Sequence, residues 1–361
     1  MILDSSIWKN RSVFLTGHTG FKGGWLTLWL NQLGANVHGY ALDPPTTPNL
    51  FEAARIKSSL VSDTRADLAD MNTLKKAYDS AKPEVVFHLA AQSLVRESYK
   101  DPIGTFVTNI IGTANVLEAA RKCESVKAIV IVTTDKVYEN HETGRPYCED
   151  DPLGGYDPYS ASKAATEIVV ASYNKSFFQN ISENSVHIAT ARSGNVIGGG
   201  DWSIDRLVPD CLRAFANKSP VELRYPKAVR PWQHVLEPLS GYLSLAEHLL
   251  TSEGGQFAKA WNFAPDISND ANVDEVAKMV ARCWGNDANL KYSESDENPH
   301  ETGVLRLDSS QAKSHLNWKP KWSLHKAVQS TVNWHRDWLI GADMESSSLI
   351  QIADYWESNI N

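Results

Sequence analysis

The stretch Val13-Phe14-Leu15-Thr16-Gly17-His18-Thr19-Gly20-Phe21-Lys22-Gly23 runs from a short apolar segment into three glycines with G-x-x-G-x-x-G spacing. A helical pattern follows from Lys22 to Leu33. Glycines let the backbone turn sharply and approach a pyrophosphate, which is stabilised at the positive N-terminus of the next helix. The stretch therefore predicts the first strand, turn and helix of a dinucleotide-binding domain. The alternative is a glycine-rich turn without a ligand.

Short apolar runs alternate with helical stretches through the first half of the chain. Strands are predicted at residues 13–15, 37–42, 61–63, 85–89, 127–133 and 186–191, and helices at 22–33, at 102–121 and around Tyr159. This alternation predicts an α/β fold with a Rossmann-type doubly wound parallel sheet.

The pattern changes after residue 194, where Gly198-Gly199-Gly200 precedes a predicted helix at 205–217 and a mixture of short strands and helices. We expect residues 1–193 to form mainly the nucleotide-binding Rossmann domain. Residues 194–361 are expected to form mainly a smaller mixed α/β domain that binds the substrate, with some segments returning to the first domain. Four C-terminal tryptophans are expected to pack helices onto the body: Trp322, Trp334, Trp338 and Trp356.

The 361 residues include 35 Lys and Arg against 43 Asp and Glu, a net charge of −8. An acidic surface argues against nonspecific binding to nucleic acid or anionic membranes. The four cysteines are scattered without a C-x-x-C pair, which predicts free thiols in a reducing cytosol and no metal site. No basic and apolar leader begins the sequence, and no apolar run approaches the roughly eighteen residues of a membrane span. We therefore expect a cytoplasmic protein.

Tyr159-Ser160-Ala161-Ser162-Lys163 places Tyr159 and Lys163 one turn apart on one face of a helix. A cation beside a phenol lowers the pKa of the phenol. A decrease from about 10 to near 7 requires roughly 4 kcal/mol, of which a bound oxidised nicotinamide can supply part. Such a phenolate can take a proton from a sugar hydroxyl while hydride leaves the same carbon. The motif alone is weak evidence, because tyrosine and lysine are common on helices.

Asp43 closes the second predicted strand, about twenty residues after the last glycine of the loop. An acidic side chain at this point can accept hydrogen bonds from the adenosine ribose, which favours NAD over its 2′-phosphorylated form. The alternative is an exposed aspartate in a turn.

These motifs together resemble the nucleotide-sugar 4,6-dehydratases, a family of the extended short-chain dehydrogenase/reductase superfamily. The resemblance is carried by residues 17–23, 87–91, 109–113, 133–138, 159–163 and 305–308. Residues 194–202 and 230–235 resemble the branch that acts on CDP-glucose. The resemblance implies NAD as the cofactor and a CDP-sugar as the substrate. The cofactor contacts that it implies are Gly17, Thr19, Gly20, Phe21, Lys22, Gly23, Asp43, Asp67, Leu68, Leu89, Ala90, Ala91, Tyr159 and Lys163.

The family's reaction oxidises C4 of the sugar, eliminates water across C5 and C6, and returns the hydride to C6. By resemblance, Tyr159 assisted by Lys163 removes the proton of the C4 hydroxyl, and Thr134 hydrogen-bonds the same oxygen. Asp135 matches the general acid for the C6 hydroxyl and must be protonated at that moment, which burial favours. The alternative for Asp135 is a strand-end carboxylate that caps a turn.

Lys136 departs from the family pattern, because several branches have a glutamate here as the base for the C5 proton. A lysine is a base only when it is neutral, and Asp135 opposes that by stabilising the ammonium. We expect Lys136 to be this base in the closed complex, or to hold a water molecule or the Asp135 carboxylate in place. The alternative is a strand-end lysine that points to solvent.

A nucleoside diphosphate carries about two negative charges, so cationic and amide donors are expected along its channel. By resemblance, Arg230 is the best diphosphate ligand and Arg206 the second. Asn195 resembles a contact to the sugar diphosphate, and Ser93 resembles a contact near the hexose. Each of these has the alternative of an ordinary surface or helix-cap residue, and His300 is a weaker candidate still.

Other functions share parts of this pattern. A UDP-hexose 4-epimerase uses Tyr159 and Lys163 but needs no acid for C6, so Asp135 discriminates against it. A 4,6-dehydratase acting on another nucleotide sugar would keep the same catalytic residues, whereas a silent NAD-binding regulator has little reason to keep them together. The resemblance also implies a homodimer or a dimer of dimers, with the helix from Pro102 and the helix of Tyr159 at the interface.

Overall fold

The computed structural model describes residues 5–178, 185–266, 269–285, 288–292 and 303–358. Its centre is a sheet of seven parallel strands in the order β11–β6–β5–β4–β1–β2–β3. These strands are β1 (Ser12–Thr16), β2 (Asn36–Ala41), β3 (Ser62–Arg65), β4 (Val85–His88), β5 (Ala128–Val132), β6 (His187–Ser193) and β11 (Ala260–Phe263). The chain runs outward from β1 to β3 and then in the other direction from β4, so the predicted doubly wound parallel sheet is confirmed.

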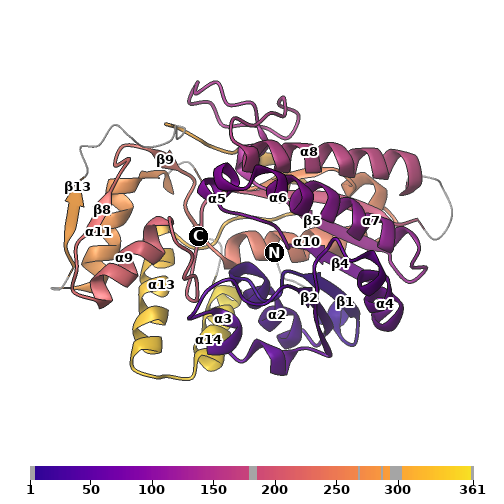
Figure 1. Cartoon of the computed structure of the whole chain (residues 1–361), viewed down its shortest axis with the longest axis horizontal. Helices are drawn as coiled ribbons and strands as arrows, with labels where there is room; N and C mark the ends of the chain where they lie inside the picture. Colours follow the sequence, from indigo (N-terminus) through magenta and orange to yellow (C-terminus); the bar gives the residue numbers. More distant parts are fainter. Residues whose placement is uncertain (1–4, 179–184, 267–268, 286–287, 293–302, 359–361) are drawn as a thin grey trace.

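Helices cover both faces of this sheet, as Figure 1 shows. One face carries α2 (Phe21–Gln32), α10 (Leu236–Leu249) and α14 (Met344–Glu357), and the other carries α4 (Met71–Ala81), α7 (Gly112–Arg121) and α8 (Pro158–Tyr173). Successive strand residues point to opposite faces, and β1 follows this rule. Val13 and Leu15 join the core of α2, whereas Phe14 packs against Tyr78 of α4 with ring centroids 4.3 Å apart. Apolar residues on both faces explain why the strands read as continuous apolar runs.

The predicted helix at 102–121 is interrupted by a wider turn. It consists of α6 (Pro102–Phe106), the π-helical turn η2 (Val107–Ile111) and α7. Asn109 lies in that turn and donates hydrogen bonds to the backbone oxygen of Gln92 at 2.9 Å and to Oγ of Ser162 at 2.8 Å. The buried amide thereby ties this helix to the loop after β4 and to α8. The 3.6-residue period that predicts the helix does not reveal such a turn.

The chain after residue 193 returns to the main sheet and also builds a second core. Strand β11 pairs with β6, and α10 packs on the sheet. The second core gathers apolar side chains such as Phe215 and Val280 from α9 (Leu207–Ala216), α11 (Val273–Trp284) and α13 (Leu324–Leu339). Short strand pairs complete this half: β7 (Val196–Ile197) with β10 (Gln233–His234), β9 (Val229–Arg230) with β12 (Ala271–Asn272), and β8 (Val221–Leu223) with β13 (Leu290–Tyr292). The division into two domains near residue 193 stays a prediction.

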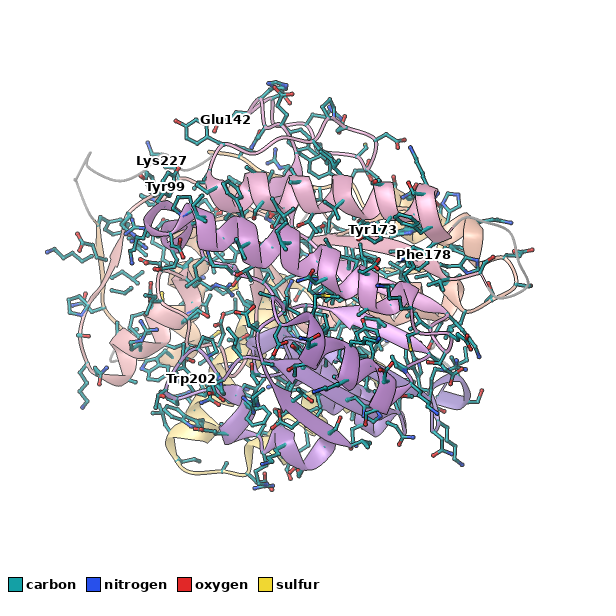
Figure 2. All side chains as sticks on the ribbon, turned by 45° about the vertical axis from the view of Figure 1, so that its right-hand side comes forward. Tyr99, Glu142, Tyr173, Phe178, Trp202 and Lys227 are labelled. Atoms are coloured by element: carbon teal, nitrogen blue, oxygen red, sulfur yellow. The ribbon has the colours of Figure 1, made fainter. Side chains whose placement is uncertain are left out.

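The C-terminal tryptophans pack as predicted. Trp322 and Trp334 are buried, and Trp338 and Trp356 pack against the main core. Trp202, labelled in Figure 2, has its ring centroid 5.7 Å from that of Trp334 and 5.0 Å from that of Trp338. These rings join the segment before α9 to the C-terminal helices.

Shorter elements connect these parts: α1 (Ser5–Trp8), α3 (Leu50–Ala53), η1 (Ile56–Ser59), α5 (Val95–Lys100), η3 (Asp135–Val137), η4 (Asn174–Phe178), η5 (Gly254–Phe257) and α12 (Ser310–His315). In the described part of the chain, no helix combines the length and the apolar content that crossing a membrane requires.

Candidate active site

A cavity of about 730 Å³ opens at the carboxyl ends of the central strands. Loops that follow β1, β2, β4, β5 and β6 line it, which includes the point where the strand order reverses between β1 and β4. Open α/β sheets bind ligands at this position, and the volume is in the range of small-molecule sites. All the predicted catalytic, cofactor-binding and substrate-binding residues line this cavity. His300 lies outside the described residues.

The glycine-rich loop forms a tight cradle between β1 and α2. Gly17 has φ of +80°, and a Cβ atom built on it would lie 2.7 Å from the backbone nitrogen of Ala90. A Cβ atom on Gly23 would lie 2.1 Å from the backbone oxygen of Gly17. Both positions therefore require glycine, and the turn brings the positive N-terminus of α2 to the cavity wall. This cradle fits a pyrophosphate.

Asp43 lies beyond the end of β2, because the strand stops at Ala41 instead of being closed by the aspartate. Its side chain is 88% exposed, and Oδ1 accepts a hydrogen bond from Nη1 of Arg65 at 3.3 Å. Asp43 is thus an exposed turn residue and also part of the cavity wall, beside the buried Leu68. With the glycine cradle, these groups fit the adenosine half of NAD.

Tyr159 and Lys163 enter the cavity from the first turns of α8. Asp157 caps this helix by accepting a hydrogen bond from the backbone nitrogen of Ser160 at 2.9 Å, and Pro158 occupies the first turn. The cap fixes where the helix begins and hence where Tyr159 lies. Both side chains are buried, and Nζ of Lys163 donates to the backbone oxygen of Val132 at 3.1 Å.

The protein groups alone raise the pKa of Tyr159 to about 12. Burial is the largest cause, and the hydrogen bond with Thr134 opposes it. Burial also lowers the pKa of Lys163 to about 8. In the chain without cofactor, burial of the phenol thus outweighs its neighbours on the helix face, and the expectation that Lys163 and a bound nicotinamide together lower this pKa stays a prediction. Ionisation of Tyr159 requires positive charge from a bound ligand.

Thr134, Asp135 and Lys136 form a compact turn at the end of β5. Oγ1 of Thr134 donates to Oδ1 of Asp135 at 2.9 Å, and Nζ of Lys136 lies 3.3 Å from the same oxygen. The Asp135 side chain is 1% exposed, and its Oδ2 has no hydrogen-bond partner among the described residues. A buried, unsatisfied oxygen on a cavity wall is a ready contact for a ligand hydroxyl. Lys136 faces this carboxylate, in contrast to the alternative of a lysine that points to solvent.

The predicted diphosphate ligands line another part of the cavity. Arg206 forms an ion pair with Asp201 at 3.2 Å and donates from Nη2 to Oγ of Ser93 at 3.3 Å. The Arg230 side chain is buried and donates from Nη1 to the backbone oxygen of Val229 at 2.9 Å. Oδ1 of Asn195 is buried without a hydrogen-bond partner in the described part of the chain. All of these groups line the same cavity.

The cavity also contains charged residues that sequence reasoning missed. Arg96 and Arg224 both pair with Asp205, at 3.6 and 2.9 Å, and Asp201 pairs with Arg206. Asp201 lies in residues 194–202, which resemble the CDP-glucose branch of the family, so this resemblance could have indicated Asp201 as a site residue. The other three have no local motif, because distant parts of the chain bring them together.

Lys22 was predicted as a cofactor contact, but its surroundings could not be predicted from the loop. Its Nζ donates to Oγ of Ser193 at 2.9 Å. Burial first, and then the charge of Arg206, lower the pKa of Lys22 to about 7. A bound anion would offset this repulsion between Lys22 and Arg206 and favour the charged form of Lys22, so the two side chains suit an anionic ligand.

Comparisons with known proteins agree with this geometry. The family model described as GDP-mannose 4,6 dehydratase matches residues 14–331. The CDP-glucose 4,6-dehydratase of Salmonella typhimurium is 46% identical over 356 residues, which cover 98% of this chain and 98% of that protein. The UDP-glucose 4-epimerase of Bacillus subtilis is 25% identical and covers 90% of this chain and 96% of that protein.

Solved structures share the fold at lower identity. A UDP-glucose 4-epimerase from Stenotrophomonas maltophila with bound NAD and formylated UDP-arabinopyranose has a TM-score of 0.79 and is 22% identical, covering 92% of this chain and 100% of that chain. A UDP-glucuronic acid 4-epimerase from Bacillus cereus in complex with UDP-glucuronic acid and NAD has a TM-score of 0.75 and is 21% identical, covering 90% and 99%.

Proposed function

The chain belongs to the GDP-mannose 4,6-dehydratase family, and on that premise we propose that it converts CDP-glucose into CDP-4-dehydro-6-deoxyglucose and water. The observation that carries this substrate is the near-full-length similarity to the Salmonella typhimurium CDP-glucose 4,6-dehydratase. The elimination of water is supported by Asp135, whose free carboxylate oxygen lies on the same cavity as Tyr159.

The cofactor is NAD, which when bound accepts the hydride from C4 of the sugar and later supplies it to C6. Gly17, Gly20 and Gly23 would hold its pyrophosphate at the N-terminus of α2, and Asp43 its adenosine ribose. Because the same hydride leaves and returns, the reaction needs no external oxidant or reductant.

Tyr159 begins the reaction by removing the proton of the C4 hydroxyl. Burial raises the pKa of Tyr159 to about 12, so the phenolate forms when positive charge is added to the cavity. The oxidised nicotinamide would supply that added charge, next to the Lys163 ammonium that is already one helix turn away. Thr134, which hydrogen-bonds Tyr159, orients the C4 hydroxyl toward the phenolate.

Asp135 and Lys136 carry the elimination as a pair. Transfer of one proton from the Lys136 ammonium to the Asp135 carboxylate, across 3.3 Å, gives an amine and a carboxylic acid without changing the net charge. The amine removes the C5 proton, which the 4-ketone has acidified, and the acid protonates the departing C6 hydroxyl. Lys136 returns its proton to C5 when hydride is added to C6. The proton held by Tyr159 then restores the acid through solvent.

Arg230 and Arg206 bind the diphosphate, with Asn195 beside it and Ser93 near the hexose. Arg206 already has Asp201 as a partner, so the diphosphate shares or replaces that contact. Bidentate binding by arginine suits a phosphate, since the guanidinium presents parallel donors.

Turnover of nucleotide sugars tests this function. The purified chain is incubated with NAD and CDP-glucose, or with the UDP, dTDP or GDP sugar, and the 4-keto-6-deoxy product is measured by its absorbance in alkali. We expect product from CDP-glucose at the highest kcat/KM. A 4-epimer formed without any keto sugar would identify an epimerase instead, and product from a different nucleotide alone would overturn the substrate.

A homodimer is proposed from the outer faces of α6, η2 and α8. Ile103, Val107, Ile111 and Ile168 are 69%, 42%, 51% and 61% exposed, and such a row of large apolar side chains favours a partner helix pair. Light scattering of the purified chain tests this, and replacing Ile103 and Ile111 by Lys should yield monomers. The four free cysteines support a cytoplasmic location, where thiols stay reduced.

A further inference from the structure

A buried ion pair lies behind the catalytic wall of the cavity. Glu167 of α8 and Arg192 of β6 meet at 2.9 Å, and each side chain is 4% exposed. We propose that this pair is a positioning element of the active site, which fixes both ends of the turn at residues 134–137 and the part of α8 that carries Lys163. The inference rests on the proposed function, in which that turn supplies Thr134, Asp135 and Lys136.

The first attachment is at the start of the turn. The Glu167 carboxylate accepts a hydrogen bond from Oγ1 of Thr133 at 2.5 Å, directly before Thr134. It also accepts from Oγ1 of Thr190 at 2.6 Å and from Nε and Nη2 of Arg192 at 2.9 and 3.1 Å. Four donors therefore satisfy a carboxylate that would otherwise be costly to bury. The carboxylate binds α8 to the ends of β5 and β6 at once.

The second attachment is at the end of the turn. Nη1 of Arg192 donates to the hydroxyl of Tyr138 at 2.8 Å and to the backbone oxygen of Glu149 at 3.0 Å. The Tyr138 hydroxyl in turn donates to Oδ1 of Asn262 at 2.7 Å. Because Glu167 and Arg192 are paired, Thr133 and Tyr138 are fixed to one rigid centre. A turn held at both ends keeps Asp135 at a constant distance from Tyr159, as catalysis by positioned groups requires.

Lys163 shares this arrangement because it lies one turn before Glu167 on α8. Its Nζ donates to the backbone oxygen of Val132, and Glu167 binds the side chain of the next residue, Thr133. The two side chains thus hold two consecutive residues, the last residue of β5 and the one that follows it. Lys163 and Tyr159 keep their place relative to Thr134 through this double attachment.

The charge of Glu167 also acts on Lys163. Burial lowers the pKa of Lys163 to about 8, and the Glu167 carboxylate opposes that decrease. The other groups that face Lys163 do not help, since Lys22 of α2 is a like charge and burial lowers the pKa of His88 on β4 to about 3. Arg192 on β6 is engaged by Glu167 itself. Without the carboxylate, Lys163 would lose its proton at a lower pH.

The variant Glu167→Gln tests the proposal, because it keeps the shape and removes the charge. We expect kcat to fall by about 10²-fold with KM changed by less than about threefold, since the turn binds substrate but no longer holds the reacting groups in line. The basic limb of the kcat profile should move to lower pH, because a larger fraction of Lys163 is neutral. Glu167→Asp, which restores the charge, should move the limb back toward that of the parent.

A second readout needs no turnover. The rate of acylation of Lys163, followed by mass spectrometry across a pH series without substrate, reports its ionisation directly and should show a lower pKa in Glu167→Gln. Glu237→Gln is the matched control, since Glu237 is a buried carboxylate with several donors that does not line the cavity. Its acylation profile and kcat profile should coincide with those of the parent.

The inference is overturned if Glu167→Gln lowers only the melting temperature and leaves both the acylation profile of Lys163 and the pH profile of kcat unchanged. The pair would then have a purely structural role. If Glu167→Gln does not fold, Thr133→Val can be used instead, because it removes one donor from the first attachment. A kcat equal to that of the parent in this variant would also overturn the inference. If the parent itself fails to turn over CDP-glucose, the proposed function fails, while the acylation series still decides the effect of Glu167 on Lys163.

Discussion

At the scale of single residues, the environment of Tyr159 opposes the ionisation that the chemistry needs. Burial raises the pKa of its phenol, and the nearby Asp135 raises it further, while Thr134 and Arg206 work in the other direction. The phenol stays neutral until the oxidised nicotinamide adds positive charge, so the base would form only in the cavity that holds the cofactor. The residue is therefore a conditional base, whose strength depends on what is bound.

Replacing Tyr159 by Phe should lower kcat by at least about 10²-fold, because a positioned general base contributes 10²- to 10⁴-fold. The measurement is formation of the alkali-absorbing keto product from CDP-glucose. The melting temperature serves as the control for folding, since the change removes one hydroxyl from a buried ring. Turnover at the parental rate would remove Tyr159 from the mechanism.

Replacing Lys136 by Met should abolish the incorporation of solvent deuterium at C5 of the product, because the thioether cannot carry the C5 proton. This result follows from the proposed mechanism, in which the amine of Lys136, paired with Asp135, is the base for the C5 proton. Incorporation is measured by nuclear magnetic resonance of the product formed in deuterium oxide. Lys75→Met, an exposed lysine of α4, is the control. Undiminished incorporation in Lys136→Met would exclude Lys136 from proton transfer.

At the scale of elements, the β1–α2 turn is the part of the site whose sequence determines its geometry most directly. Replacing Gly23 by Ala puts a Cβ atom 2.1 Å from the oxygen of Gly17, so the turn must open or the helix must shift. We expect NAD affinity, measured by quenching of protein fluorescence, to fall by about fivefold to 150-fold, since overpacking typically costs 1–3 kcal/mol. The control is Gly255→Ala, whose Cβ would meet only an atom 3.9 Å away. Equal NAD affinity in both variants would contradict the role of this turn.

The elements with regular periodicity could be predicted from the sequence. The central strands β1, β4 and β5 are mainly apolar runs with both faces buried, whereas β3 is polar and partly exposed. The parallel sheet then sets the positions of the loops that follow the strands. For this reason every predicted site residue in the described part of the chain lines one cavity. The exact end of β2 could not be predicted, because Leu42 continues the apolar run and is 59% exposed. The π-helical turn around Asn109 was also missed, since it depends on partners 17 and 53 residues away.

Contacts between distant segments account for the rest. Glu167 and Arg192 are 25 residues apart, and Arg96 and Asp205 are farther apart still, so no local pattern indicates either pair. The effect of burial on the pKa of Tyr159 could not be predicted for the same reason. A helix face predicts which residue lies beside it, whereas burial by several loops decides the pKa.

At the scale of the whole molecule, the C-terminal segment locks onto the sheet through one buried carboxylate. Glu237 at the start of α10 accepts hydrogen bonds from the backbone nitrogens of Lys321 and Trp322, at 3.0 and 2.7 Å, and from the hydroxyl of Tyr355 at 2.7 Å. Tyr355 belongs to α14, which packs against α2 and so contacts the helix of the cofactor loop. The C-terminal helices thereby support the cavity without lining it.

This contact makes the stability of the molecule depend on pH. Burial raises the pKa of Glu237 from 4.5 to about 7. The folded chain therefore keeps a proton that the unfolded chain releases as the pH rises from 4.5 to about 7, so the free energy of unfolding decreases across that window, by roughly 3 kcal/mol from this group.

Glu237→Gln, which cannot titrate, should remove that decrease. Urea unfolding at several pH values across the window gives the free energy of unfolding of the parent minus that of the variant, and this difference should shrink as the pH rises. The control is Glu253→Gln, which changes an exposed carboxylate and should leave the pH dependence of the parental stability unchanged. A parent-minus-Glu237→Gln difference that stays constant from pH 4.5 to 7 would show that Glu237 is ionised throughout and that its three donors outweigh its burial.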